Sequence, residues 1–378
     1  MEHSTLFVTG MQRCGTTLLE KLLCNHPQVS VLSQPLPFLF LEAKRSFLQR
    51  IGRGQDQFPL GDLFLENAYT EAEFTRYLLD YCIDGQTLKN LFAAMESYSG
   101  QQTRFDELKL NSLIDRFSAA ELLPTLSRLY REFAHKSGAE RFGGKETICE
   151  EFLPYFLRRG CKCLMILRDP RDMLASLNYG RGLEYGGRLK PTLSNLRNWR
   201  KSVAYALHLQ GRSGFTWIRY EDLVLKPIEC LSKATEMLEV APFTRNFFAG
   251  GVKDQSGRIW EGNSSHVPHN GITHSSAGTY KSLLPAALVS YTEAVCYPEL
   301  RALGYSLSIE WPQVPQIIAS FEEPYEIERT GLREHFMDRT RAAEELKRVE
   351  FLSSSGPAPV SYFLFEDVIP KLREAVFK

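Results

Sequence analysis

Residues 4–24 read STLFVTGMQRCGTTLLEKLLC, and this stretch decides the fold. Its first six residues are mostly apolar and end at Gly10, which is typical of a buried strand. Leucines then recur at helical spacing from Thr16 to Cys24, and Asn-His-Pro follows them as a stop signal. A strand, a tight turn and a helix in this order open many phosphate-binding α/β domains. The stretch therefore predicts an α/β fold with an anion site at the turn.

The turn itself, Gly10 to Thr17, has the spacing G-x-x-x-x-G-T-T. Its glycines let successive backbone N–H groups point inward, the helix adds its positive N-terminal end, and Thr16 and Thr17 add hydroxyl donors. In loops that bind nucleoside triphosphates a lysine stands at the Thr16 position. Here the cation is Arg13, inside the loop, which favours an anion with a shorter phosphate chain. The alternative is a capped glycine turn with a solvated arginine.

A second anion site is predicted where another strand ends. Residues 163–167 are apolar, and Arg168-Asp169-Pro170 follow them directly. Pro170 suits the first turn of a helix, Asp169 can cap that helix, and Arg168 stands at the carboxyl end of a strand, where parallel sheets bind ligands. Ser176, two turns further, could reach the same anion. The pattern predicts a ligand with two separated phosphates, although an Arg/Asp network at a helix start would look the same.

The remaining sequence alternates strand-like and helix-like segments, which predicts a mostly parallel sheet covered on both faces. We expect a P-loop-like three-layer fold over residues 1–310, interrupted by a large helical insertion at 35–140, and a helical extension at 311–378. The expected strands are 4–9, 29–32, 163–167 and 215–220, with strand or loop at 141–148. The expected helices are 16–24, 150–159, 171–177, 193–209, 227–239, 283–303, 326–350 and 361–377.

The composition narrows the class of protein. The 378 residues include 45 Lys and Arg against 45 Asp and Glu, so the formal net charge is zero. This balance argues against nucleic-acid coating and polybasic membrane binding, so local groups must hold any anion. The sequence shows neither a secretory signal pattern nor an apolar run of membrane-spanning length. Its eight cysteines are scattered. We therefore expect a cytoplasmic protein with reduced thiols, no nucleic-acid partner and no membrane span, and a homodimer stays open.

Together the two anion motifs resemble those of sulfotransferases that use 3′-phosphoadenosine-5′-phosphosulfate (PAPS). The loop from Gln12 to Thr17 looks like the family's 5′-phosphosulfate loop, P-[RK]-S-G-T-T, and residues 167–172 with Ser176 look like its 3′-phosphate motif. Three weaker segments follow in the family's order: 142–147 resembles G-x-K-[TD], 220–223 resembles YEDL, and 275–280 resembles S-x-G-x-W. The likeness covers about residues 4–305 and is greater to the bacterial, tyrosylprotein and carbohydrate branch than to the cytosolic phenol branch.

The resemblance implies PAPS as sulfate donor, no metal, and a hydroxyl or amine of a small molecule, lipid or carbohydrate as acceptor. It assigns Arg13 to the 5′-phosphate and sulfuryl oxygens, and Lys145 to the charge that builds on the bridging oxygen. The tyrosine of the YEDL-like segment would lie near the adenine. The residues it implies for donor binding are Arg13, Cys14, Gly15, Thr16, Thr17, Arg168, Ser176, Tyr220, Ser276 and Lys281.

The proton acceptor cannot be copied from the family. The tyrosylprotein branch has a glutamate where this chain has Gln34, and glutamine cannot take a proton. Our first candidate is His266, because three histidines crowd into one polar loop and histidine titrates near neutral pH. Glu42 is the second candidate. A metal site formed by His266, His269 and His274 is the alternative, but no flanking Asp or Cys supports it.

Other departures from the family pattern keep further functions open. Gln12 and Cys14 stand where proline and serine are usual, and Thr279 stands where a basic residue is common, although Lys281 is nearby. The alternatives are a P-loop kinase or NTPase, against which the missing loop lysine argues, and a non-catalytic nucleotide-binding protein. Aromatic side chains in the 35–140 insertion either line an acceptor pocket or pack its helices.

Overall fold

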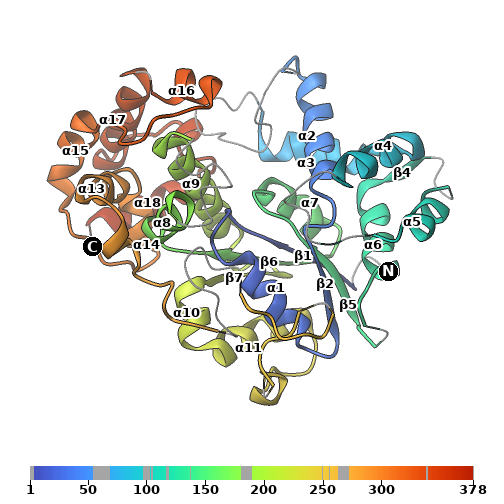
Figure 1. Ribbon diagram of the computed structural model, residues 1–378. Coiled ribbons are helices and arrows are strands. Elements are labelled where there is room, and N and C mark those ends of the chain that lie inside the picture. Colours follow the sequence, from blue (N-terminus) through green and yellow to red (C-terminus); the bar gives the residue numbers. More distant parts are fainter. Residues whose placement is uncertain are drawn as a thin grey trace.

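A five-stranded parallel sheet forms the centre of the computed structural model, with strand order β2-β5-β1-β6-β7 (Figure 1). The structure describes residues 4–53, 69–96, 103, 105–115, 119–136, 138–179, 190–248, 250–254, 256–262, 272–337 and 339–377. The strands are β1 (Thr5–Thr9), β2 (Val29–Ser33), β5 (Arg141–Lys145), β6 (Lys162–Leu167) and β7 (Phe215–Arg219). The predicted α/β fold with a central parallel sheet is confirmed.

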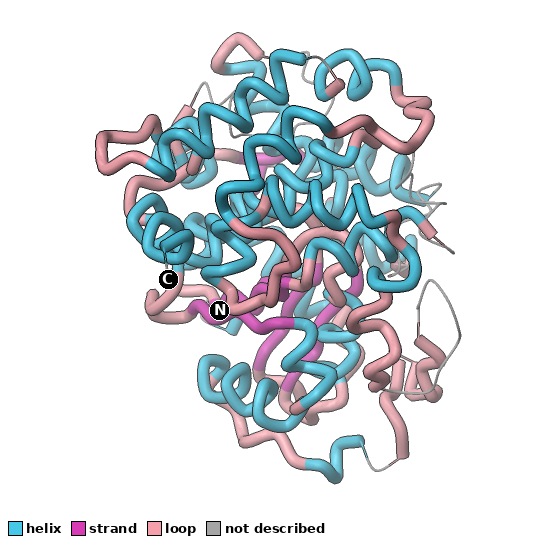
Figure 2. Tube along the Cα trace, turned by 90° about the vertical axis from the view of Figure 1, so that its left-hand side faces the viewer, coloured by secondary structure: helices cyan, strands magenta, loops and turns pink. Residues whose placement is uncertain are grey.

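Helices cover both faces of this sheet because alternate side chains of each strand point to opposite sides. Leu6 and Val8 of β1 share a core with one layer, formed by α1 (Thr16–Cys24), α10 (Tyr220–Leu225) and α11 (Pro227–Leu238). Phe7, between them, stacks on Phe156 and Phe40 of the other layer. That layer contains α2 (Pro37–Arg50), α6 (Leu122–Glu132), α7 (Leu153–Arg158) and α9 (Thr192–Leu209). Figure 2 shows the strands between a smaller and a much larger helical part.

The described residues of the 35–140 segment are mostly helical, but they also contain a short antiparallel ribbon. Its further helices are α3 (Glu71–Asp80), α4 (Gly85–Glu96) and α5 (Glu107–Ile114), and the ribbon pairs β3 (Cys82–Asp84) with β4 (Ala119–Glu121). Strands of three residues are too short to show an alternating pattern, so the sequence analysis missed them. Phe40, Phe47, Phe74 and Phe92 are buried in the core, so these rings pack the helices.

The described residues from 280 onward are largely helical, with more breaks than expected. The predicted 283–303 helix is divided at Cys296, just before Pro298, and the predicted 326–350 helix is divided near 338. The last helix begins at Val368, not at 361, because residues 360–362 form a 3₁₀ turn and Leu364 has a φ of 67°. These helices are α12 (Tyr280–Leu283), α13 (Ala286–Val295), α14 (Tyr297–Ala302), α15 (Val314–Ser320), α16 (Thr330–Phe336), α17 (Arg339–Ser353) and α18 (Val368–Phe377). Earlier in the chain, α8 (Pro170–Asn178) follows β6.

Candidate active site

The loop between β1 and α1 is built on backbone conformations that favour glycine. Gly15, the N-cap of α1, has a φ of 93°, and Arg13 also adopts a left-handed conformation with a φ of 63°. A Cβ on Gly15 would lie 2.4 Å from Cδ2 of Tyr220, so this ring packs directly on the loop. No side chain caps α1, which leaves the N–H groups of its first turn for an anion.

The two predicted anion motifs meet in space, although they are more than 150 residues apart. Nε of Arg13 donates a hydrogen bond to Oγ of Ser176 at 2.9 Å. Arg168 spans the other side of the loop: Nη1 donates to the Arg13 carbonyl at 3.0 Å and Nη2 donates to the Ser276 carbonyl. Its guanidinium also lies 4.4 Å from the centre of the Tyr220 ring. Five of the predicted donor-binding residues therefore form one cluster with Gly15.

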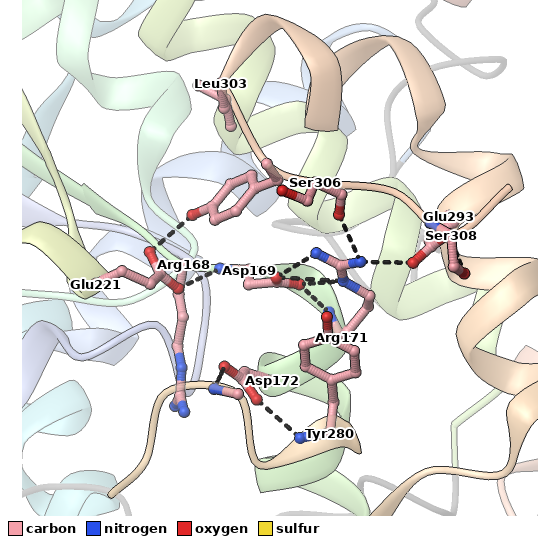
Figure 3. Close-up of polar contacts among 12 residues, drawn as sticks. Arg168, Asp169, Arg171, Asp172, Glu221, Tyr280, Glu293, Leu303, Ser306 and Ser308 are labelled. Carbon is pink, nitrogen blue, oxygen red and sulfur yellow. Dashed lines mark hydrogen bonds and ion pairs between the residues drawn. The ribbon is translucent and has the colours of Figure 1, made fainter. Parts of the chain in front are cut away.

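Buried polar contacts hold the Arg168 end of β6 in place (Figure 3). Nε1 of Trp199 donates to the Arg168 carbonyl at 2.7 Å, and the Asp169 N–H donates to Oε1 of Glu221 at 2.9 Å. Asp169 caps α8, as predicted, by accepting from the Arg171 N–H at 2.9 Å. Burial raises the pKa of Glu221, whose other oxygen accepts from the Tyr305 hydroxyl.

Asp172 connects this helix to the late segment that contains Ser276. Its carboxylate accepts from the N–H groups of Gly278 and Tyr280 at 2.6 and 2.9 Å (Figure 3), and from the Thr279 hydroxyl at 3.1 Å. This role of Asp172 could not be predicted from the sequence, where its local signal is an acid in the first turn of a helix. Lys281 is exposed on α12, and none of the described residues pairs with its side chain.

Lys145 is the last residue of β5, and its side chain is fully buried. Its partner is Gln34, the residue that replaces the catalytic glutamate of the tyrosylprotein branch. Nζ of Lys145 donates to Oε1 of Gln34 at 3.1 Å, while the Gln34 N–H donates to the Lys145 carbonyl at 2.8 Å. Gln34 has a φ of 43°, and the next turn is held by Oε1 of Glu146, which accepts from the Leu36 N–H at 2.7 Å. Burial lowers the pKa of Lys145 to about 8, against the opposing effect of nearby carboxylates, and burial raises the pKa of Glu146.

The candidates for the proton acceptor are not brought to this cluster by any described contact. His266 and His269 lie outside the described residues. Glu42 is half-buried on α2, where its charge, after burial itself, raises the pKa of Tyr81. In the part of the chain that the structure describes, no three His, Cys, Asp or Glu side chains are placed to hold a metal ion. No described helix is long and apolar enough to cross a bilayer.

Comparisons with known proteins bear on this site. Residues 5–245 match the model of a sulfotransferase family. Among solved structures, the chain is similar to the sulfotransferase domain from the curacin biosynthetic pathway, with 22% identity, a TM-score of 0.47, and coverage of 80% of this chain and 98% of that one. The chain is also similar to a sulfotransferase from Alicyclobacillus acidocaldarius, with 16% identity, a TM-score of 0.38, and coverage of 80% of this chain and 96% of that one. A third similar structure is mouse sulfotransferase SULT7A1, solved with PAP (adenosine 3′,5′-bisphosphate). It has 11% identity, a TM-score of 0.39, and coverage of 79% of this chain and 84% of that one.

No curated protein matches the chain significantly in sequence. The family match covers well over half of the chain and contains the loop with Arg13, the buried Lys145, and Arg168 with Ser176. The chain belongs to the sulfotransferase family.

Proposed function

We propose that this protein transfers a sulfuryl group from PAPS to a hydroxyl or amine of a small-molecule, lipid or carbohydrate acceptor. The observation that carries the proposal is the cluster in which Arg13, Ser176 and Arg168 converge on one glycine loop. Nε of Arg168 is buried and has no hydrogen-bond partner among the described residues, which fits an arginine that binds an anion. The PAP in the structure of the mouse relative supports the same donor.

Each part of the cluster has a role in this proposal. Arg13, Thr16 and Thr17, with the backbone of Cys14 and Gly15, would bind the 5′-phosphate and the sulfuryl oxygens. Arg168 and Ser176 would bind the 3′-phosphate, and Tyr220, Ser276 and Lys281 would complete the nucleotide site. Lys145 would neutralise the negative charge that develops as the sulfur–oxygen bond to phosphate breaks. Because α1 is not capped by a side chain, its N-terminal end adds to the same positive field.

The larger architecture suggests where the acceptor enters. We propose that residues 1–310 are the sulfotransferase domain, that the 35–140 insertion and the 250–275 segment form the acceptor pocket, and that 311–378 is an extension. The eight free thiols and the balanced charge support a cytoplasmic location. A homodimer is also proposed, and size-exclusion chromatography with light scattering tests it.

Selective stabilisation by adenosine 3′,5′-bisphosphate tests the proposed donor site. We expect this nucleotide to raise the melting temperature without magnesium, whereas ATP, GTP and NAD at the same concentration have little effect. A ligand present at 100 times its Kd stabilises by about 2.7 kcal/mol. Transfer of labelled sulfate from PAPS to an acceptor then separates an enzyme from a non-catalytic binder. Magnesium-dependent stabilisation by ATP alone would instead support a P-loop kinase or NTPase.

Donor binding is expected to weaken as the pH rises through about 8. Burial lowers the pKa of Lys145 to about 8, so the ammonium that attracts the anionic donor is lost above that pH. In Lys145→Arg the cation persists, and the decline should move to higher pH. The stability of the free protein depends on pH in the opposite direction. Its free energy of unfolding rises from about pH 8 towards 10.5, because in this range the lysine of the unfolded chain still holds its proton and the buried lysine does not. Calorimetric titration with adenosine 3′,5′-bisphosphate from pH 6 to 9.5 checks the affinity; a decline shared by both proteins would rule out Lys145 as its origin.

A further inference from the structure

One face of α9 is polar and is directed at the carboxyl end of the sheet. Trp199 shows which way this face points, because its Nε1 donates a hydrogen bond to the carbonyl of Arg168, at the end of β6, at 2.7 Å. Asn195, Asn198 and Ser202 lie on the same side of the helix as Trp199, since residues three, four and seven apart share a face. Most of this face is buried. Polar side chains therefore border the donor cluster on the α9 side of the sheet.

Glu150 meets this face from the segment that follows β5. It is fully buried, and its Oε1 accepts a hydrogen bond from Oγ of Ser202 at 2.5 Å. The turn before it is tied to the glycine loop, because the Ile148 N–H donates to the Gly10 carbonyl at 3.1 Å. Burial, and after it charges that include Glu150, raise the pKa of the Cys14 thiol inside the loop. The carboxylate therefore lies between α9 and the loop that contains Arg13.

Three buried atoms here make no hydrogen bond to any described residue: Oε2 of Glu150, Nδ2 of Asn195 and Oδ1 of Asn198. Leaving a buried donor or acceptor unpaired costs free energy, so each such atom calls for a partner that the described residues do not supply. Two acceptors and one donor match a ligand that carries hydroxyl groups. Asn195 and Asn198 share the face of Trp199, which is bonded to Arg168, and Glu150 follows a turn that is bonded to the glycine loop, so the ligand we assign to these atoms is the sulfate acceptor.

We propose that Glu150 accepts the proton of the acceptor hydroxyl, and that Asn195 and Asn198 bind neighbouring polar groups of the acceptor. This inference rests on the proposed sulfotransferase function and replaces His266 as its proton acceptor. The acceptor oxygen forms a bond to sulfur while the bond from sulfur to the bridging oxygen of the donor phosphate breaks. The electron pair of that bond leaves with adenosine 3′,5′-bisphosphate, and the hydroxyl proton moves to Oε2 of Glu150.

Other titratable groups surround this carboxylate. Lys201 of α9 pairs with Glu151 at 3.4 Å, next to Glu150 in the sequence. The groups whose pKa is raised in part by the charge of Glu150 are Cys14 of the loop, Cys149 of its own segment and Tyr205 of α9. Burial raises the pKa of Tyr205 and of both thiols, so these stay protonated at neutral pH. These groups therefore do not compete with Glu150 for the proton of the acceptor hydroxyl.

The test compares wild type with Glu150→Gln, which keeps the size of the side chain and the hydrogen bond from Ser202. Release of labelled sulfate from PAPS to water, and transfer to simple sugar alcohols, should fall by about 10²–10⁴-fold in kcat. The Kd for adenosine 3′,5′-bisphosphate should not change. Glu150→Asp should recover part of the rate. In Asn198→Ala the KM for the sugar alcohol should rise more than kcat falls.

A phenol acceptor separates proton transfer from a structural role. 4-Nitrophenol is already largely ionised at mildly alkaline pH and needs no base, so Glu150→Gln should lose much less activity with it than with an alcohol. The matched control is Glu299→Gln on α14, another buried carboxylate with one oxygen on Arg348 and the other unpaired among the described residues; its kinetics should equal wild type. Equal losses with phenol and alcohol, or no loss in Glu150→Gln, would overturn the assignment. A wild type that binds the bisphosphate but transfers sulfate to nothing, water included, would overturn the proposed function itself.

Discussion

Arg13→Ala is expected to reduce sulfuryl transfer by about 10²–10³-fold or more, with the fold retained. The guanidinium lies at the centre of the donor cluster, bonded to Ser176, and it is the cation of a loop that has no lysine at the P-loop position. The loop itself should survive, because Arg168 holds it through the Arg13 carbonyl rather than through the side chain. Steady-state kinetics with PAPS, together with thermal melting, measure both effects.

Two further variants sharpen this prediction. Arg13→Lys keeps a positive charge but loses the planar group that makes two parallel hydrogen bonds, so it should recover only part of the activity. Arg333→Ala removes an exposed arginine from α16, outside the proposed sulfotransferase domain, and it should behave as wild type. Near-normal turnover in Arg13→Ala would remove this residue from the mechanism, and unfolding would show that the loop needs the side chain.

The fold could be predicted because its decisive signals are local. In residues 4–24 an apolar run, a glycine turn and a leucine-patterned helix follow one another, and β1 and α1 begin and end within one residue of the expected positions. The same holds at the end of β6, where Asp169 and Pro170 start a helix and leave Arg168 at the sheet edge. Motifs of this kind depend on neighbouring residues, so they can be recognised without knowledge of the tertiary contacts.

The rest of the site depends on contacts between distant residues. Gln34 pairs with Lys145, 111 residues away, and Asp172 holds Gly278 and Tyr280 more than 100 residues away. Glu150 carries no sequence pattern of its own; only the fold places it against Ser202 with one oxygen unpaired among the described residues. A ligand with two phosphates predicts that the motifs of Arg13 and Arg168 lie near each other, but it does not predict the direct bond from Arg13 to Ser176.

Glu345→Ala is expected to destabilise the protein by about 3–5 kcal/mol, because it leaves two arginines buried without their shared carboxylate. Glu345 of α17 accepts from Nε of Arg197 at 2.7 Å and from Nη1 of Arg200 at 2.5 Å, and all three side chains are buried. Burial alone would raise the pKa of Glu345, but the two guanidinium groups lower it to about 2. The stabilisation is therefore complete above about pH 4.5 and is lost as the pH falls towards 2.

The neighbouring Glu344 offers a matched control. It also contacts Arg197, at 3.1 Å, but its side chain is 25% exposed, so Glu344→Ala should cost less than about 1 kcal/mol. Urea unfolding at pH 7 and pH 3 measures both variants, and the difference between wild type and Glu345→Ala should shrink at the lower pH. Arg197 and Arg200 belong to α9, whose opposite side carries Asn195, Asn198 and Ser202. If Glu345 of the extension fixes the position of α9, Glu345→Ala should raise the KM for the acceptor even under conditions where the variant is folded. Equal losses of stability in Glu345→Ala and Glu344→Ala would show that Glu345 does not hold α9 in this way.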